Sequence, residues 1–232
     1  MSTVASKKKT AKEQRIKVTL NGPYLVTGGV PLSEQIILIN DDGDPQGWRE
    51  GKRYPAQESY ALCRCGMTGN RPFCDGTHVK RGFDGTEVAD TGPLLDGTVV
   101  TEGPALKLND IEELCASARF CHRAGGTWDL VEQSGDPQAR KIAIETSADC
   151  PSGRLVLTDK KSGKIIEPVF ERSIGIVEDP QAGLGGPIWV RGGILVECAD
   201  GKVYEIRNRV TLCRCGRSHN KPFCDSAHMH GW

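Results

Sequence analysis

The chain has 232 residues, of which 26% are charged, and its 30 basic and 30 acidic side chains give a formal net charge of zero. This balance gives no basis for a nucleic-acid or membrane partner, and an aromatic content of 6% with 28 glycines favours small, loop-rich units over one large core. Ten cysteines are present. Because we find no signal peptide or transmembrane run, we expect a cytoplasmic protein whose thiols bind metal rather than form disulfides.

The first part of the chain contains a tail and the first copy of a repeat. Residues 1–15 are polar and rich in lysine, which predicts a solvated, disordered basic tail. Alternating apolar and polar residues predict a strand over 16–20. The next segment, GPYLVTGGV at 22–30, returns as GPIWVRGGI at 186–194. The chain therefore repeats a Gly-Pro-led strand followed by a Gly-Gly turn.

The repeat extends beyond these two segments. Each copy continues with a second strand, at 36–39 and 194–196, and with a short strand that leads into a cysteine motif, at 59–62 and 209–212. The first copy also contains an extra loop over 40–53, rich in Asp, Gly and Lys or Arg.

The middle segment does not repeat the ends. It predicts strands over 98–101, 105–108 and 141–144, and a hairpin of strands 155–158 and 164–169. Asn109 to Glu112 has capping-box spacing, which predicts the start of a short helix. Residues 116–126, with Cys121 and His122, are expected to form a loop or short helix.

Two motifs of identical spacing, C-x-C-x8-C-x3-H, follow the short strands. Their candidate ligands are Cys63, Cys65, Cys74 and His78 in the first copy, and Cys213, Cys215, Cys224 and His228 in the second. A one-residue gap places two thiols on one face of extended backbone. A three-residue gap places the other two ligands on one helical turn, with Pro72 at or just before it. The free N–H groups at such a helix start would stabilise a negatively charged group.

Two kinds of metal site fit three cysteines and one histidine. Structural zinc accepts this ligand set. Iron–sulfur clusters also take thiolates, and a histidine can replace a cysteine. Zinc knuckles usually have two or more residues between the first two cysteines, so the one-residue gap favours iron–sulfur while leaving zinc open.

The motif resembles the signature of the CDGSH, or mitoNEET-like, iron–sulfur family. The family pattern C-x-C-x2-[ST]-x3-P-x-C-D-G-[SAT]-H fits residues 63–78 at every fixed position, including Thr68 and Pro72. The second copy departs once, where Ser226 replaces the glycine. The resemblance implies one [2Fe–2S] cluster in each copy, bound by the three cysteines and the histidine named above. It also implies that the two copies pack about a two-fold axis with exchanged strands, here as an internal pseudo-dimer.

Three further cysteines, Cys115, Cys121 and Cys150, lie in the middle segment. A cubane ferredoxin has a C-x2-C-x2-C run and a remote Cys-Pro. Here Ala118 occupies the second position of the run, and Cys150-Pro151 corresponds to the remote pair. The sequence CPSGRL at 150–155 resembles the divergent single-cluster ferredoxins, which implies a [3Fe–4S] cluster, or a [4Fe–4S] cluster with a fourth ligand. The alternative is that these are ordinary buried or loop cysteines without metal.

Together these features predict an α+β, mostly β fold. Two NEET-type β-cap halves, at 16–84 and 171–232, would form the pseudo-dimer, and a ferredoxin-like middle domain would occupy 85–170. The expected function is one-electron transfer or cluster transfer to a redox or apo-protein partner, coupled to pH through the histidines. A monomer is expected, with a homodimer as the alternative. No nucleophile or acid–base constellation indicates an enzyme. The alternative function is a zinc-binding scaffold without a redox role.

Overall fold

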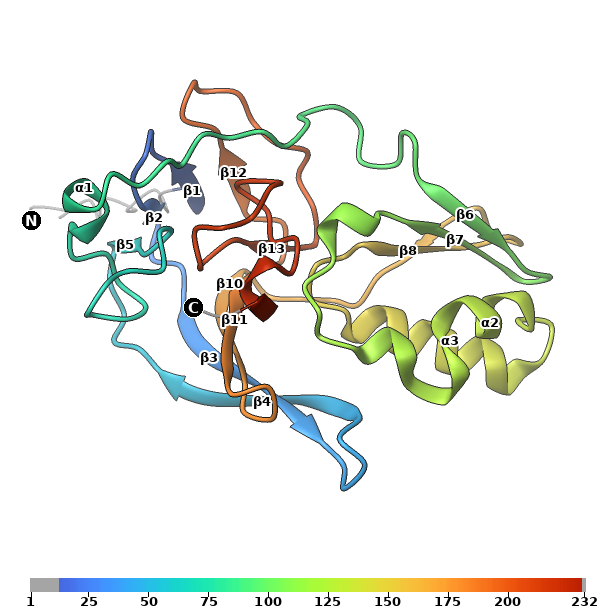
Figure 1. Ribbon diagram of the computed structural model, residues 1–232. Coiled ribbons are helices and arrows are strands. Elements are labelled where there is room, and N and C mark those ends of the chain that lie inside the picture. Colours follow the sequence, from blue (N-terminus) through green and yellow to red (C-terminus); the bar gives the residue numbers. More distant parts are fainter. Residues whose placement is uncertain (1–12, 231–232) are drawn as a thin grey trace, which may run out of the picture.

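The computed structural model describes residues 13–230 (Figure 1). The predicted basic tail therefore lies outside the described residues, except for its last three, and Arg15 already belongs to the first strand. The molecule contains three sheets, and two of them are built from the repeated ends of the chain.

The first sheet has the strand order β12-β1-β2-β5. Its strands are β1 (Arg15–Val18), β2 (Tyr24–Thr27), β5 (Ser59–Leu62) and β12 (Leu195–Glu197). The second sheet has the order β13-β11-β10-β3-β4. Its strands are β3 (Leu32–Ile39), β4 (Pro45–Arg53), β10 (Ser173–Asp179), β11 (Leu184–Arg191) and β13 (Arg209–Leu212).

Each of these sheets contains strands from both copies: the first sheet takes β12 from the second copy, and the second sheet takes β3 and β4 from the first. β1 pairs in parallel with β12, with Ile16 opposite Val196. In the same way β10 pairs in parallel with β3, with Ile174 opposite Leu32. All other pairs in the two sheets are antiparallel. The exchange is reciprocal, so the predicted strand-swapped pseudo-dimer and the α+β, mostly β class are confirmed.

One hydrophobic core holds the two copies together. Side chains from both sheets are buried in a single cluster, which includes Ile16, Tyr24 and Leu62 from the first copy and Ile174, Ile188 and Leu212 from the second. Leu62 and Leu212 occupy equivalent places and are both fully buried. Because neither sheet can bury its apolar face alone, the copies are expected to fold as one unit.

The third sheet and four helical segments form the middle region, which we define as residues 99–166. The sheet has the order β6-β7-β8-β9, with β6 (Val99–Glu102), β7 (Leu106–Asp110), β8 (Leu155–Asp159) and β9 (Ile165–Ile166). Helices α2 (Thr127–Glu132) and α3 (Pro137–Asp149) cover one face (Figure 1). Two 3-10 segments precede them, η1 (Glu112–Leu114) and η2 (Phe120–Gly125). Two short helical segments contain the last residue of each cysteine motif, α1 (Thr77–Lys80) and η3 (Ala227–His230).

Three expectations about these elements are wrong. The strand predicted at 141–144 belongs to α3, because Asp136 caps that helix by accepting hydrogen bonds from the N–H groups of Gln138 and Ala139. The loop predicted at 40–53 contains β4, which pairs with β3. The helix predicted from Asn109 is reduced to the single turn η1, because Asp110 ends β7 and pairs with Arg154. β10 is a further strand that no expectation covers.

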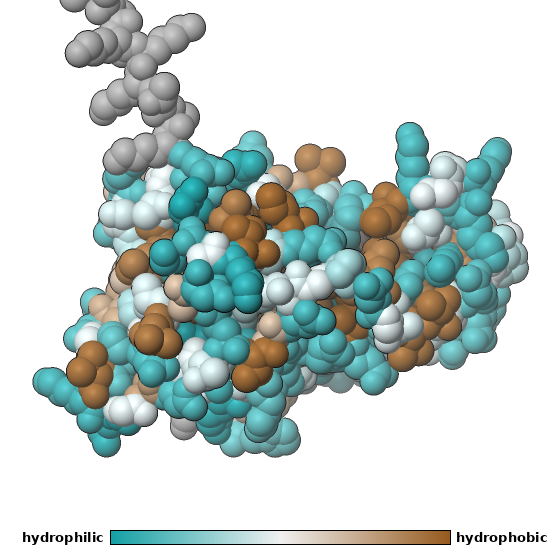
Figure 2. All heavy atoms as spheres, turned by 90° about the horizontal axis from the view of Figure 1, so that it is seen from above, coloured by the Kyte–Doolittle hydropathy of each residue, from teal (hydrophilic) through white to brown (hydrophobic). Residues whose placement is uncertain are grey.

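Two further observations concern the helices and the surface. Among residues 13–230, none of the helices combines the length and the apolar character needed to cross a bilayer. The face in Figure 2 carries apolar side chains in separate patches between hydrophilic ones.

Candidate metal centres

The first motif folds so that its four candidate ligands form two pairs. The N–H of Cys63 donates to the carbonyl of Pro72, and the N–H of Cys74 donates to that of Ala61, so the two halves of the motif lie side by side. The sulfur atoms of Cys63 and Cys65 are 3.6 Å apart. The Cys74 sulfur lies 3.3 Å from Nδ1 of His78.

The second motif repeats this arrangement. Cys213 and Cys224 donate through their N–H groups to Pro222 and Thr211. The sulfur atoms of Cys213 and Cys215 are 3.7 Å apart, and the Cys224 sulfur lies 3.5 Å from Nδ1 of His228. The loop that carries each set therefore has the same conformation in both copies.

In each motif the candidate ligands lie as two pairs, one of two cysteines and one of a cysteine and a histidine. A [2Fe–2S] core needs two protein ligands at each of two irons, whereas structural zinc needs four ligands around one point. Backbone N–H groups of Met67 and Gly76 also lie 3.5 Å from the sulfurs of Cys65 and Cys74, where they would stabilise thiolate charge.

The recurring polar residues of the motif shape the loop. The Asp75 carboxylate accepts hydrogen bonds from the N–H groups of Gly69 and Thr77, at 2.8 and 3.0 Å. These donors hold the pKa of the Asp75 carboxyl well below its usual range. Asp225 accepts from His219 and Ala227 in the same way. The aspartate thus fixes the turn that presents the last two ligands.

The predicted helical turn between these ligands is wrong in one respect. α1 begins at Thr77, and Gly76 stands at its N-cap in the left-handed conformation, with φ 84°. Cys74 therefore precedes the helix, Pro72 lies outside it, and only His78 is helical. A helix of one turn gives little basis for the predicted stabilisation of charge at a helix start.

Two arginines between the ligands have a structural role. Arg64 and Arg214 are 1% and 5% exposed, so both side chains are buried in the protein. Arg64 donates to the carbonyls of Thr19 and Gly85. Arg214 donates to the carbonyl of Gly186 at 2.9 Å. Arg64 thus ties the first motif to the segment after β1 and to the segment after α1, and Arg214 ties the second motif to β11.

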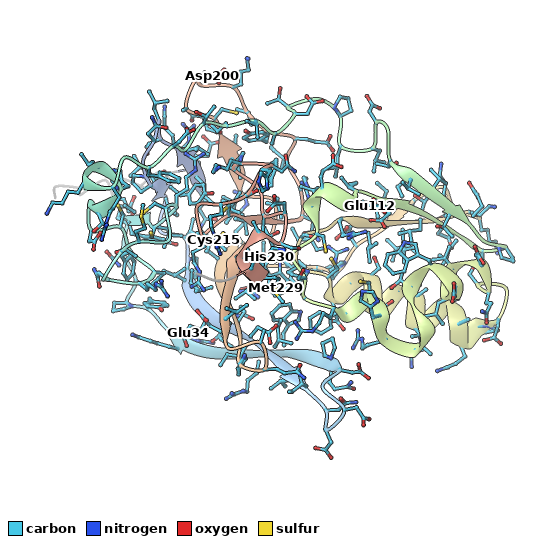
Figure 3. All side chains as sticks on the ribbon, viewed as in Figure 1. Glu34, Glu112, Asp200, Cys215, Met229 and His230 are labelled. Atoms are coloured by element: carbon cyan, nitrogen blue, oxygen red, sulfur yellow. The ribbon has the colours of Figure 1, made fainter. Side chains whose placement is uncertain are left out.

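The two motifs touch each other across the pseudo-two-fold axis. Cys65 and Cys215 form an antiparallel bridge. Gly66 and Gly216 have φ angles of 78° and 80°. A Cβ at either glycine would lie 2.7 or 2.6 Å from the carbonyl oxygen of the opposing cysteine, so only glycine fits. The prediction that the motifs pack together is confirmed, and Figure 3 shows Cys215 near the centre of the view.

The two histidines differ in exposure. His78 is half-buried. His228 is only 5% exposed, because η3 packs against β11. This burial, together with the charge of Arg214, lowers the pKa of His228 to about 4. The first motif is thus the one that meets solvent at its histidine.

The middle region brings its three cysteines together. Cys115 follows η1, Cys121 lies in η2 and Cys150 follows α3, and all three line one small cavity with Arg154. Arg154 and Asp110 form a buried double hydrogen bond at 2.7 and 2.6 Å, which fixes the cavity wall. Burial raises the pKa of the Cys121 thiol to about 12. The convergence of the thiols fits a group that binds three cysteines.

Two residues that contact this cavity carry no functional assignment in the sequence. Ser226 donates its hydroxyl to the carbonyl of Cys115, and Arg209 donates to the carbonyl of Cys150. A comparison of the two copies could have indicated both residues, because the first copy has Gly76 in place of Ser226 and Ser59 in place of Arg209.

Comparison with protein families agrees with this division. The model described as "Iron-binding zinc finger CDGSH type" matches residues 21–79 and 185–229. The model described as "Divergent 4Fe-4S mono-cluster" matches residues 101–160. No curated protein and no solved structure shows a significant match to the chain. The chain is therefore an iron–sulfur protein with two CDGSH-type iron-binding regions and a divergent 4Fe-4S mono-cluster region between them.

Proposed function

We propose that the protein carries single electrons through three iron–sulfur centres that lie in a row. Cys63, Cys65, Cys74 and His78 would hold one [2Fe–2S] cluster, and Cys213, Cys215, Cys224 and His228 a second. Cys115, Cys121 and Cys150 would hold a [3Fe–4S] cluster, or a [4Fe–4S] cluster with one further ligand. Such clusters accept and release one electron at a time.

The observation that carries this proposal is the direct contact between successive sites. The first and second motifs meet at the Cys65–Cys215 bridge, where residues opposite each other in a sheet have Cα atoms roughly 5 Å apart. The second motif and the middle cysteines meet at Ser226 and Cys115. Figure 1 shows the corresponding elements in sequence across the molecule, with α1 on the left, η3 in the centre and the middle region on the right.

The histidine ligands would couple electron transfer at the first and second centres to the uptake or release of protons. In both motifs Nδ1 faces the neighbouring thiol, so it is the nitrogen suited to bind iron. Nε2 is then left to take or release a proton, and electron uptake would depend on pH. A histidine that becomes protonated also releases iron more readily, which would allow cluster donation under acid conditions.

The proposal also concerns partners. The half-buried His78 marks the first motif as the place where a redox protein would exchange electrons. Since one chain already contains both halves of the pseudo-dimer, the protein is proposed to act as a monomer.

Iron and sulfide analysis of protein purified without oxygen tests the function. The proposal predicts a red-brown protein with about seven irons and about eight sulfides per chain for a third centre of the [3Fe–4S] type, or about eight of each for a [4Fe–4S] type. About four of each would remove the middle centre from the proposal. A colourless protein with stoichiometric zinc would overturn it in favour of a scaffold.

A further inference from the structure

The second CDGSH motif differs from the first in how it contacts the middle region. Ser226 donates its hydroxyl to the carbonyl oxygen of Cys115 at 2.7 Å. The equivalent residue of the first motif is Gly76, and a Cβ built there meets no heavy atom within 4 Å. One motif is therefore docked on another part of the protein at this turn, and the other is open.

Serine is an unfavourable residue at this place unless its side chain has a role. Ser226 has a φ angle of 72°, in the left-handed region that costs an L-residue free energy and costs glycine nothing. Gly76 adopts the same conformation with φ 84°. The hydrogen bond to Cys115 is the contact that distinguishes the serine from the glycine and offsets this cost.

Other second-copy residues support the same docking. Asn220 donates its side-chain amide to the carbonyl of Glu113 at 3.2 Å. Ile111 and Leu114 are buried in the same apolar cluster as Phe223. The second motif thus binds the backbone of this segment at Glu113 and Cys115, and Phe223 shares an apolar cluster with its side chains.

A second cysteine of the cavity is fixed from the same side. Arg209 is 1% exposed and donates from Nη1 to the carbonyls of Ala148 and Cys150, each at 2.7 Å. Glu167 accepts from the same guanidinium group. The first copy instead contacts the middle region through β4, where Trp48 donates to the carbonyl of Asp149.

From these contacts we infer that Ser226 is a positioning residue that holds Cys115 against the second motif, so that the middle centre exchanges electrons with the second centre rather than directly with the first. The inference rests on the proposed function for its electron-transfer part. The docking itself depends only on contacts within the polypeptide. Loss of the hydroxyl is expected to loosen residues 113–117 and to weaken the interaction between the second and middle centres.

The test uses the full-length protein with Ser226→Ala, Ser226→Gly and a matched control, Gly76→Ser. Both Ser226 variants lack the hydroxyl, whereas only glycine removes the backbone strain, so a shared effect reports the hydrogen bond. Hydrogen exchange of the amides at 113–117 is expected to become about 5-fold faster in both variants. The spin–spin interaction between the second and middle centres, measured by EPR on the same samples, is expected to weaken. Gly76→Ser should change neither quantity.

Unchanged exchange at 113–117 in both Ser226 variants would overturn the inference, and so would an equal change in the Gly76→Ser control. Faster exchange with an unchanged spin–spin interaction would overturn its electron-transfer part. A chain found to contain no iron would refute the proposed function instead, while the exchange experiment would still decide whether Ser226 holds Cys115.

Discussion

The two CDGSH motifs have the same ligand spacing and the same sulfur geometry, yet they occupy different environments. The first presents a half-buried His78 and an open turn at Gly76. The second buries His228 and uses Ser226 at the equivalent turn to contact Cys115. A duplicated site has thus been specialised by the residues around its ligands, because the ligands themselves are alike. We propose that the first site exchanges electrons with a partner and that the second exchanges them within the protein.

The largest difference between the motifs is expected from removing one ligand of each. Cys65→Ser and Cys215→Ser should each lose about two irons and two sulfides per chain. Only Cys215→Ser should also prevent electrons that enter at the first site from reaching the middle centre, because the second site lies between them. Stopped-flow reduction followed by EPR measures this. Equal reduction of the middle centre in both variants would contradict the proposed order.

Arg209 of the second copy and Ser59, the equivalent residue of the first, are expected to differ strongly in their contribution to the free energy of unfolding. Arg209→Met leaves the carbonyls of Ser147, Ala148 and Cys150 and the carboxylate of Glu167 without their buried partner. We expect a loss of about 3 kcal/mol in the free energy of unfolding. The equivalent exposed residue of the first copy is Ser59, and Ser59→Ala should change stability by less than about 0.5 kcal/mol. Urea denaturation measures both values, and similar losses would show that the copies are supported alike.

The contact between the motifs should behave symmetrically. Gly66→Ala and Gly216→Ala would each combine a left-handed backbone with a Cβ closer than 3 Å to a carbonyl oxygen. Each is expected to cost about 2 kcal/mol or more in unfolding free energy. Gly76→Ala serves as the control, since it carries the same strain in open space and should cost about 1 kcal/mol. A cost at Gly66 no greater than at Gly76 would argue against close contact between the motifs.

These sites also show what could be predicted from the sequence. The repeat of GPYLVTGGV and the fixed spacing of Cys63 to His78 predicted the ligand loops, because such features depend on residues close together in the chain. The packing of the two copies against each other was implied by the family resemblance. The short strands at 59–62 and 209–212 match β5 and β13 for the same reason.

The remaining features depend on contacts across long stretches of chain. Residues 141–144, KIAI, read as a strand, although Asp136 and Pro137 start a helix whose buried side includes Ala139 and Ala143. The hydrogen bond from Ser226 to Cys115 joins residues 111 positions apart. The sequence showed that Ser226 departs from the family pattern, but it did not indicate that Cys115 is the hydrogen-bond partner of Ser226. Local patterns cannot report which distant carbonyl a hydroxyl will meet.

The smallest expected difference concerns pH. If the histidine ligands take up a proton on reduction, the potential of a site falls as pH rises, by up to about 59 mV per pH unit for one electron and one proton. The burial that lowers the pKa of His228 to about 4 opposes a proton at the second site, so the second site should contribute little of the slope near neutral pH. Potentiometric titration of His78→Cys and His228→Cys at several pH values checks this. A slope that survives in His78→Cys and disappears in His228→Cys would reverse the assignment.

The central claim is that the second centre lies between the first and the middle centre. Pulsed EPR on the reduced protein measures the separations of the three centres directly, with Cys65→Ser and Cys215→Ser used to assign the signals. We predict that the distance from the first to the middle centre exceeds both of the other distances. A first-to-middle distance shorter than either of them would contradict the account.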